Sequence, residues 1–283
     1  YVWTVQIHWQ KTLQKLNAFS KSKPTNINSP KEERMKAIIT DLDRTLLHTD
    51  KSVSEHTITV LQKCHDHGIL IMAASARPLR DILIYNDLIG FDAITATNGA
   101  VVSLPQNLLE IGIPCESGEK ILSAILQYPD VFLSIETSKG LYSNRDIPVW
   151  KPVVWDKFPT LPEDINLYKI LASSQQNPLY EGIETTLTDD VYHTIANNDL
   201  IQIMSNEATK WNGIKQMLSH FGVSPSDAVY FGDDNDDIES IKNCGLGVAV
   251  SNAIPSVLDA ADHITESNDQ DGVAKCLEKI ILS

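Results

Sequence analysis

A short apolar run that ends in two carboxylates constrains the fold of this chain more than any other feature. Ala37–Thr40 is apolar and rich in β-branched residues, and Asp41 and Asp43 follow it directly. A run of this length between polar residues predicts a buried strand. Carboxylates at its carboxyl end lie in the crevice where open α/β sheets bind ligands. Because two carboxylates this close repel each other, we expect a cation or a shared proton beside them.

From Met35 onward, strand-like runs alternate with helical patterns. Further strands are predicted at Ile69–Ala74, Ala93–Thr97, Ala228–Phe231, Gly247–Val250 and His263–Thr265. Helices are predicted at Ser54–His67, from Pro78 toward Gly90, at Gly213–His220 and from about Gly272 to Leu282. This alternation predicts an α/β fold with a doubly wound parallel sheet, similar to a Rossmann core.

The middle of the chain differs from the rest in composition and in its hydrophobic pattern. Residues 114–190 are rich in proline and aromatic residues, with a helical pattern at Gly118–Gln127 and strand-like runs at Val131–Ile135 and Leu167–Leu171. We interpret this stretch as an inserted α+β cap domain. The core is therefore predicted to comprise residues 35–113 and 191–283, with both ends of the insertion returning to the main sheet.

Composition and charge narrow the class of protein. The formal net charge of −14 argues against a sequence-independent nucleic-acid binder, which needs a basic surface. A phosphorylated small molecule stays compatible, because a bound Mg²⁺ reverses the local field. The four cysteines show no C-x-x-C spacing, which disfavours a zinc site or a disulfide framework. No apolar run approaches the ~18 residues that span a bilayer, so we predict no membrane segment and a cytoplasmic location.

The first 34 residues differ from the rest. They carry six basic and two acidic side chains, and Ser20–Pro30 has the composition of a linker. Met35 stands immediately before the first strand. We expect Met35 to be the natural start and residues 1–34 to be a disordered or non-native extension. A basic targeting peptide is the alternative.

Four short motifs in order give the chain a family resemblance. They are Asp41-x-Asp43-x-Thr45, Ser75 in Ala74-Ser-Ala-Arg77-Pro78, Lys210 in Ala208-Thr-Lys-Trp-Asn212, and Gly232-Asp233-x-x-x-Asp237. Together they resemble the haloacid dehalogenase-like phosphatases, in particular the Cof-type branch with an α/β cap. The resemblance covers roughly Met35 to Ser283. Each motif alone is weak, but all four beside the expected elements are strong.

The resemblance implies a role for each motif residue. Asp41 attacks phosphorus and forms an aspartyl-phosphate, while Asp43 protonates the leaving oxygen and then activates water. Ser75 and Lys210 count as catalytic because they hold the phosphoryl oxygens and neutralise charge. Mg²⁺ is the expected cofactor. Its expected ligands are the Asp41 side chain, the Asp43 backbone carbonyl, Asp233, and Asp237 directly or through water. The expected substrate and phosphate contacts are Ser75, Ala76, Arg77, Asn98, Lys210 and Asp236.

Simpler interpretations exist for single residues. Lys210 alone is typical of a surface lysine, and the acidic run at 233–237 is typical of a solvated loop. Four positions also depart from the pattern of the branch. Arg44, Ala76 and Trp211 stand where glycine is usual, and Asp236 stands where asparagine is usual.

The predicted function is that of a Mg²⁺-dependent phosphomonoesterase acting on small metabolites, with sugar phosphates the first candidates. A phosphomutase of the same fold is one alternative, and a non-catalytic phosphate-binding protein is another. The substrate is expected to be selected by the cap, where Glu136, Tyr142, Arg145 and Trp150 are candidate contacts. The sequence indicates nothing about the oligomeric state.

Overall fold

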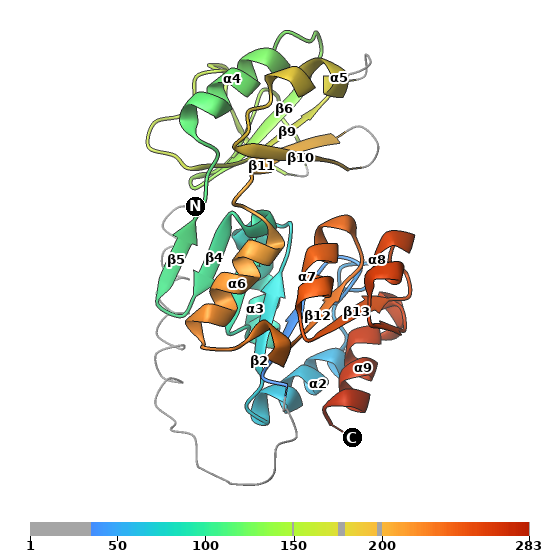
Figure 1. The fold of residues 1–283 in the computed structure, drawn as a ribbon. Helices are drawn as coiled ribbons and strands as arrows, with labels where there is room; N and C mark the ends of the chain where they lie inside the picture. The colour runs from blue at the N-terminus through green and yellow to red at the C-terminus, as the bar shows by residue number, and fades with distance from the viewer. Residues whose placement is uncertain (1–34, 149, 175–178, 197–199, 283) are drawn as a thin grey trace.

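Two sheets, each with its own hydrophobic core, make up this protein (Figure 1). The computed structural model describes residues 35–148, 150–174, 179–196 and 200–282. The predictions for residues 1–34 lie outside the described residues.

The larger sheet has eight strands in the order β14-β13-β12-β1-β2-β3-β4-β5. Their bounds are β1 Ala37–Thr40, β2 Leu70–Ala74, β3 Ala93–Ala96, β4 Val101–Leu104, β5 Asn107–Glu110, β12 Ala228–Gly232, β13 Leu246–Val250 and β14 His263–Thr265. From β14 to β3 all neighbours are parallel, as the doubly wound prediction requires. The β4 and β5 strands are antiparallel and extend the edge as a hairpin, so the whole sheet is mixed.

Helices cover the larger sheet in two groups. The bounds are α2 Glu55–Asp66, α3 Leu79–Ile89, α6 Lys210–His220, α7 Ile238–Asn243, α8 Pro255–Ala260 and α9 Gly272–Ile280. The α2 helix packs against α3 and α9, while α7 packs against α6 and α8. Because apolar strands are buried between the two groups, every residue of β1 is inaccessible to solvent.

Local sequence signals set the ends of these helices. Ser54 caps α2 by accepting a hydrogen bond from the Thr57 backbone N at 3.0 Å. Gly90 ends α3 in the left-handed conformation, with φ of 77°. Thr209 caps α6 by accepting from the Asn212 backbone N at 3.1 Å. The cap at Thr209 fixes the start of α6, and therefore the position of Lys210.

The second sheet forms the inserted cap domain. Its six strands run in the order β10-β11-β9-β6-β7-β8. The bounds are β6 Phe132–Thr137, β7 Gly140–Ser143, β8 Val153–Val154, β9 Leu167–Ser173, β10 Val191–Ala196 and β11 Leu200–Ser205, with helices α4 Cys115–Ile125 and α5 Leu179–Ile183. Figure 1 shows α4 and α5 on the side of this sheet away from the core domain. The sheet therefore turns its other side toward the core.

The predicted return to the core at residue 191 is wrong. Val191–Ala196 pairs with Leu200–Ser205, which pairs in turn with β9, so 191–205 belongs to the cap sheet. The cap therefore ends just before α6. The predicted boundary failed because an antiparallel hairpin of apolar strands resembles the buried strands of the core in sequence.

The two faces of the cap sheet differ in chemistry. Side chains alternate along each strand, so every second residue faces the same side. Ile135, Ile170 and Ile203 belong to the hydrophobic core under α4 and α5. Glu136 and Lys169, which are paired across β6 and β9, therefore lie on the side that faces the core domain.

Candidate active site

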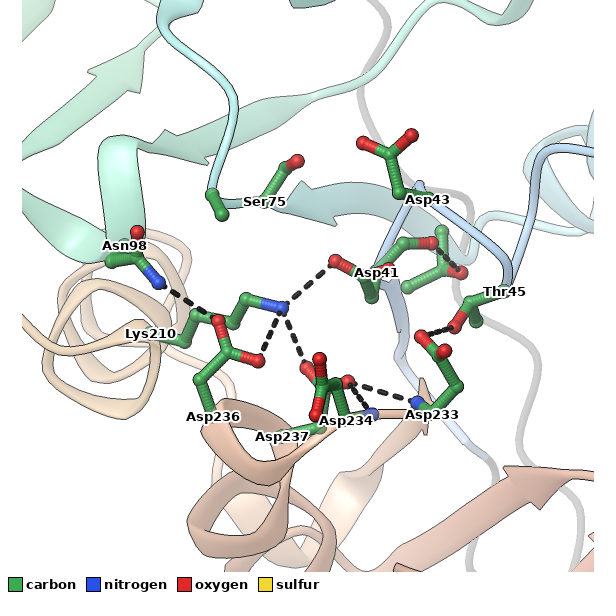
Figure 2. Close-up of polar contacts among 12 residues, drawn as sticks. Asp41, Asp43, Thr45, Ser75, Asn98, Lys210, Asp233, Asp234, Asp236 and Asp237 are labelled. Atoms are coloured by element: carbon green, nitrogen blue, oxygen red, sulfur yellow. Dashed lines mark hydrogen bonds and ion pairs between the residues drawn. The ribbon is translucent and has the colours of Figure 1, made fainter. Parts of the chain in front are cut away.

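The predicted site residues converge at the carboxyl ends of four neighbouring strands (Figure 2). Asp41 follows β1, Ser75 follows β2, Asn98 follows β3 and Asp233 follows β12. Lys210 enters from the first turn of α6. This edge of a doubly wound sheet is where such folds bind ligands. The fold thus brings together residues that lie far apart in the sequence.

Lys210 is the central cation of the site. Its Nζ lies 2.8 Å from Oδ1 of Asp41, 2.7 Å from Oδ1 of Asp237 and 3.2 Å from Oδ1 of Asp236. The side chain is only 3% exposed, which excludes the surface-lysine interpretation. Burial alone would lower the pKa of Lys210, but the neighbouring carboxylates, Asp236 foremost, outweigh it and raise the pKa well above its usual value.

Asp237 organises the loop around it. Its Oδ1 accepts hydrogen bonds from Lys210 at 2.7 Å and from the Tyr230 hydroxyl at 2.5 Å. Its Oδ2 accepts from the backbone N of Asp233 at 2.9 Å and of Asp234 at 3.0 Å. A Cβ at position 232 would come within 2.5 Å of the Asp237 Cβ, so Gly232 is needed for this close approach.

Asp41, Asp233 and Asp237 form a buried cluster of oxygen donors. One carboxylate oxygen from each lies within 4.8 Å of the others. Burial, opposed by Lys210, raises the pKa of Asp41 well above its usual value. Burial and the charge of Asp237 raise the pKa of Asp233 to about 6. Clustered acids with raised pKa values favour a cation, and an all-oxygen donor set suits Mg²⁺.

The four hydrogen bonds that Asp237 accepts make it a poorer candidate for direct metal ligation. A carboxylate has about four lone-pair sites, and these donors occupy them. Asp41 and Asp233 are therefore the better candidates for direct ligation. Asp233 is additionally oriented by the Thr45 hydroxyl, which donates to its Oδ1 at 2.9 Å. Thr45 is thus a supporting residue that the sequence motif contains.

The Asp43 carboxylate lies outside that cluster, although it is only two residues from Asp41. Arg77 binds it with two hydrogen bonds, of 2.6 Å from Nε and 2.7 Å from Nη2, and Lys51 donates a third at 2.7 Å. Burial alone would raise the pKa of Asp43, but the hydrogen bonds from Arg77 and Lys51 outweigh it and lower the pKa to about 2. In this conformation Asp43 is an ionised partner of Arg77, so its use as an acid requires that it leave Arg77.

The expected phosphate contacts lie on two adjacent loops. Ser75 is buried, and its Oγ accepts from the Arg77 backbone N at 3.2 Å. Asn98 donates from Nδ2 to Oδ2 of Asp236 at 2.8 Å (Figure 2). Asp236 also pairs with Lys210, and Lys210 pairs with Asp41. A continuous chain of polar contacts therefore runs from Asn98 to the predicted nucleophile.

Three departures from the branch pattern have a structural context. Arg44 has φ of 60°, a left-handed conformation that glycine adopts without strain. Trp211 is 8% exposed and packs into the hydrophobic core beneath α6. Asp236 takes part in the pairing with Lys210 and is not a solvated charge.

The cap supplies further polar contacts to the core. Glu136 forms a bidentate ion pair with Arg80 of α3, with 2.8 Å between Nη2 and Oε2. Tyr142, in contrast, packs against Trp155 and the cap's own hydrophobic core. Arg145 lies over the ring of Phe132, and Trp150 is 47% exposed. Of the four cap candidates, only Glu136 contacts the core domain among the contacts of the described residues.

Sequence reasoning missed four side chains that complete the site. Lys51 binds Asp43, Tyr230 binds Asp237, and Lys169 and Gln202 contact each other at 3.2 Å on the cap. Lys169 did carry a signal, because a charged residue interrupts the apolar strand Leu167–Ser173. Tyr230 sits inside a strand where an aromatic residue is ordinary, so its hydroxyl gave no signal.

Comparison with known proteins identifies the family. The model of the haloacid dehalogenase-like hydrolases matches residues 38–277, which is most of the chain. The chain belongs to the haloacid dehalogenase-like hydrolase family. This confirms both the resemblance found in the motifs and the predicted fold class.

Individual relatives match over nearly their whole length. A putative phosphatase of Bacillus subtilis, YxeH, is 29% identical over 271 residues, which cover 88% of this chain and 99% of the relative. A phosphatase of the same superfamily from Bacteroides thetaiotaomicron has a similar structure, with a TM-score of 0.77 at 24% identity and coverage of 90% and 98%. The subclass IIB sugar phosphatase BT4131 matches with a TM-score of 0.72 at 20% identity, covering 86% of this chain and 98% of that one.

Across the described ranges, every helix is too short or too polar to cross a membrane.

Proposed function

We propose that this hydrolase is a Mg²⁺-dependent phosphomonoesterase that cleaves small phosphorylated metabolites through an aspartyl-phosphate on Asp41. One observation carries the proposal. Asp41 is buried at the end of β1, paired with Lys210 at 2.8 Å and clustered with Asp233. A carboxylate nucleophile beside a fixed cation and a second metal-binding carboxylate is the arrangement that phosphoryl transfer needs.

The positions of the side chains support the following first half-reaction. An oxygen of Asp41 attacks phosphorus, and the bond to the leaving oxygen breaks on the opposite side of the phosphoryl group. Lys210 offsets negative charge on the phosphoryl oxygens, and the hydroxyl of Ser75 donates a hydrogen bond to one of them. Asp43, once released from Arg77 and protonated, gives its proton to the leaving oxygen.

The second half-reaction returns the enzyme to its starting state. Asp43, now ionised, removes a proton from water, and the water oxygen attacks the phosphorus of the aspartyl-phosphate. Inorganic phosphate leaves and Asp41 is regenerated. The hydrogen bonds from Arg77 and Lys51 then favour the ionised form of Asp43 until the next substrate binds.

Mg²⁺ fits the donor set at the end of β1 and β12. Asp41 and Asp233 would hold it with the backbone carbonyl of Asp43, while Asp237 keeps Lys210 and the loop in place. When bound, the ion neutralises negative charge on the phosphoryl group and on the carboxylates.

Sugar phosphates are the substrate class we favour. The side of the cap sheet that faces the site carries Glu136, Lys169 and Gln202, which suit a polar leaving group better than an apolar one. The sugar phosphatase BT4131 shares the fold and the cap. A cytoplasmic location stays a prediction from the cysteine pattern and the absence of a long apolar run in the sequence.

The test is release of inorganic phosphate from p-nitrophenyl phosphate and from a panel of sugar phosphates. We expect turnover that requires Mg²⁺, is lost with EDTA, and falls by at least about a thousandfold in Asp41→Asn. Asp234→Asn, at an exposed position of the same loop, is the matched control and keeps the activity within about threefold. Absence of metal-dependent turnover across the panel would overturn the proposal in favour of a binding protein.

A further inference from the structure

A lysine of the cap reaches the site and meets only neutral oxygens there. The Lys169 Nζ lies 2.5 Å from Oδ1 of Asn98, 3.2 Å from Oε1 of Gln202 and 3.4 Å from the backbone O of Ala76. Its side chain is buried, with 4% of the residue exposed. Within the described residues, no carboxylate oxygen comes within 4.0 Å of this ammonium. Burial lowers the pKa of Lys169 to about 8.

The nearest carboxylates already have other partners. Glu136, the cross-strand neighbour of Lys169, is bound by Arg80. Asp236 is bound by Lys210 and Asn98. A buried ammonium that is not paired with an anion is costly, and nothing in the packing demands one on this strand. Leu171, two residues along on the same face, is apolar, so this face does not carry charge at every position.

Lys169 lies on the side of the cap sheet that faces the site. The polar contacts run outward from the nucleophile in the order Lys210, Asp236, Asn98 and Lys169. In-line attack by Asp41 sends the ester oxygen away from the end of β1, toward the side covered by the cap. The part of the substrate beyond that oxygen therefore approaches the Lys169 ammonium.

The contact with Ala76 is the weakest of the three. At 3.4 Å it is near the limit for a hydrogen bond, and a substrate oxygen can replace the carbonyl as acceptor. We propose that the ammonium of Lys169 binds an oxygen substituent on the carbon adjacent to the one that bears the phosphate ester. Lys169 would thereby select hydroxylated over plain alkyl phosphates. This assignment rests on the function proposed above and names the residue that selects its substrate class.

The experiment compares two ligands that differ only in hydroxyl groups, glycerol 1-phosphate and propyl phosphate. Their dissociation constants are measured by calorimetry with Mg²⁺ in the Asp41→Asn variant, which does not consume them. We expect glycerol 1-phosphate to bind at least about tenfold more tightly, the gain typical of hydrogen bonds to a charged donor. Adding Lys169→Met should remove most of this preference. Lys139→Met, at an exposed lysine of the same domain, is the matched control and should retain it.

Each outcome decides the assignment. A preference that survives Lys169→Met overturns it, and so does the absence of any preference or of any binding in Asp41→Asn. Lys169→Gln keeps a polar end group and serves as a second variant, and circular dichroism verifies folding of both. Phosphate release by the unmodified enzyme is measured separately. If that release is absent while the binding preference depends on Lys169, the phosphatase function fails and the ligand contact stands.

Discussion

The two sheets of this enzyme treat charge in opposite ways. At the carboxyl edge of the core sheet, Lys210 is bound by three carboxylates, and Asp237 takes four hydrogen bonds from its surroundings. On the facing side of the cap sheet, Lys169 has only neutral acceptors. The core edge therefore holds its lysine within an excess of carboxylates, whereas the lysine of the cap is, among the described residues, hydrogen-bonded to neutral oxygens alone. Under the function we propose, the core sheet carries the chemistry and the cap sheet selects the substrate.

The largest effect is expected from removing the lysine that holds the carboxylates of the core edge together. Lys210→Met leaves Asp41, Asp236 and Asp237 buried without their cation. Removing one partner of a buried ionic cluster costs about 3–5 kcal/mol, so the free energy of unfolding in EDTA should fall by that amount. Urea denaturation measures it, and phosphate release should fall to background. Lys215→Met, on the same helix, is the control. A fully stable Lys210→Met variant would show that Lys210 does not stabilise the buried carboxylates as we describe.

A change of pH sharpens the comparison, because the carboxylates whose pKa values are raised, Asp41, Asp233 and Asp236, all lie on the core side. With the pKa of Asp233 at about 6, against an ordinary 3.8, the folded chain holds a proton that the unfolded chain has lost between about pH 4 and 6. Stability without metal should therefore fall as the pH rises through this window. Asp43 has the opposite sign, since its pKa is lowered to about 2, but it acts below pH 4.

The measurement is the melting temperature with and without Mg²⁺. Because the metal binds the ionised carboxylates, the rise caused by Mg²⁺ should be larger at pH 7.5 than at pH 5. Asp233→Asn should abolish most of that rise at both values. Equal Mg²⁺ effects at pH 5 and pH 7.5 in the unmodified protein would contradict the assignment of Asp233 as a titrating ligand.

The smallest effect is expected where the two domains meet. Glu136→Gln weakens the bidentate pair with Arg80, whose side chain is 41% exposed. The Glu136 side chain is buried, at 8% exposed, and only the Arg80 end of the pair reaches solvent. Weakening such a pair costs about 1 kcal/mol, so KM should rise about two- to fivefold while kcat changes less. Steady-state kinetics on a sugar phosphate measures the split, and Glu163→Gln, at an exposed cap position, is the control. A loss of kcat alone would indicate that the pair does not act through the position of the cap.

The core edge was largely predictable from sequence because its residues follow strands within short motifs. Asp41, Ser75 and Asp233 each stand directly after a run of apolar residues, and parallel strands bring such positions together. The Arg77 contact of Asp43 was not predictable, since the direction of a side chain depends on partners from other loops. The cap resisted prediction for a related reason. Its strand alternation indicates which residues share a face, but not which face meets the core.

The parallel pairing of β1 with β12 has a consequence for the order in which the domains can fold during synthesis. Ala37 pairs with Ala228, so the strand that carries Asp41 lacks one neighbour until most of the chain has left the ribosome. The cap, from Cys115 to Ser205, is continuous in sequence and has its own hydrophobic core. The cap can fold during translation, before β12 is available to pair with β1. The cap, which we propose to select the substrate, can thus be complete before Asp41, the proposed nucleophile, has both neighbouring strands in place.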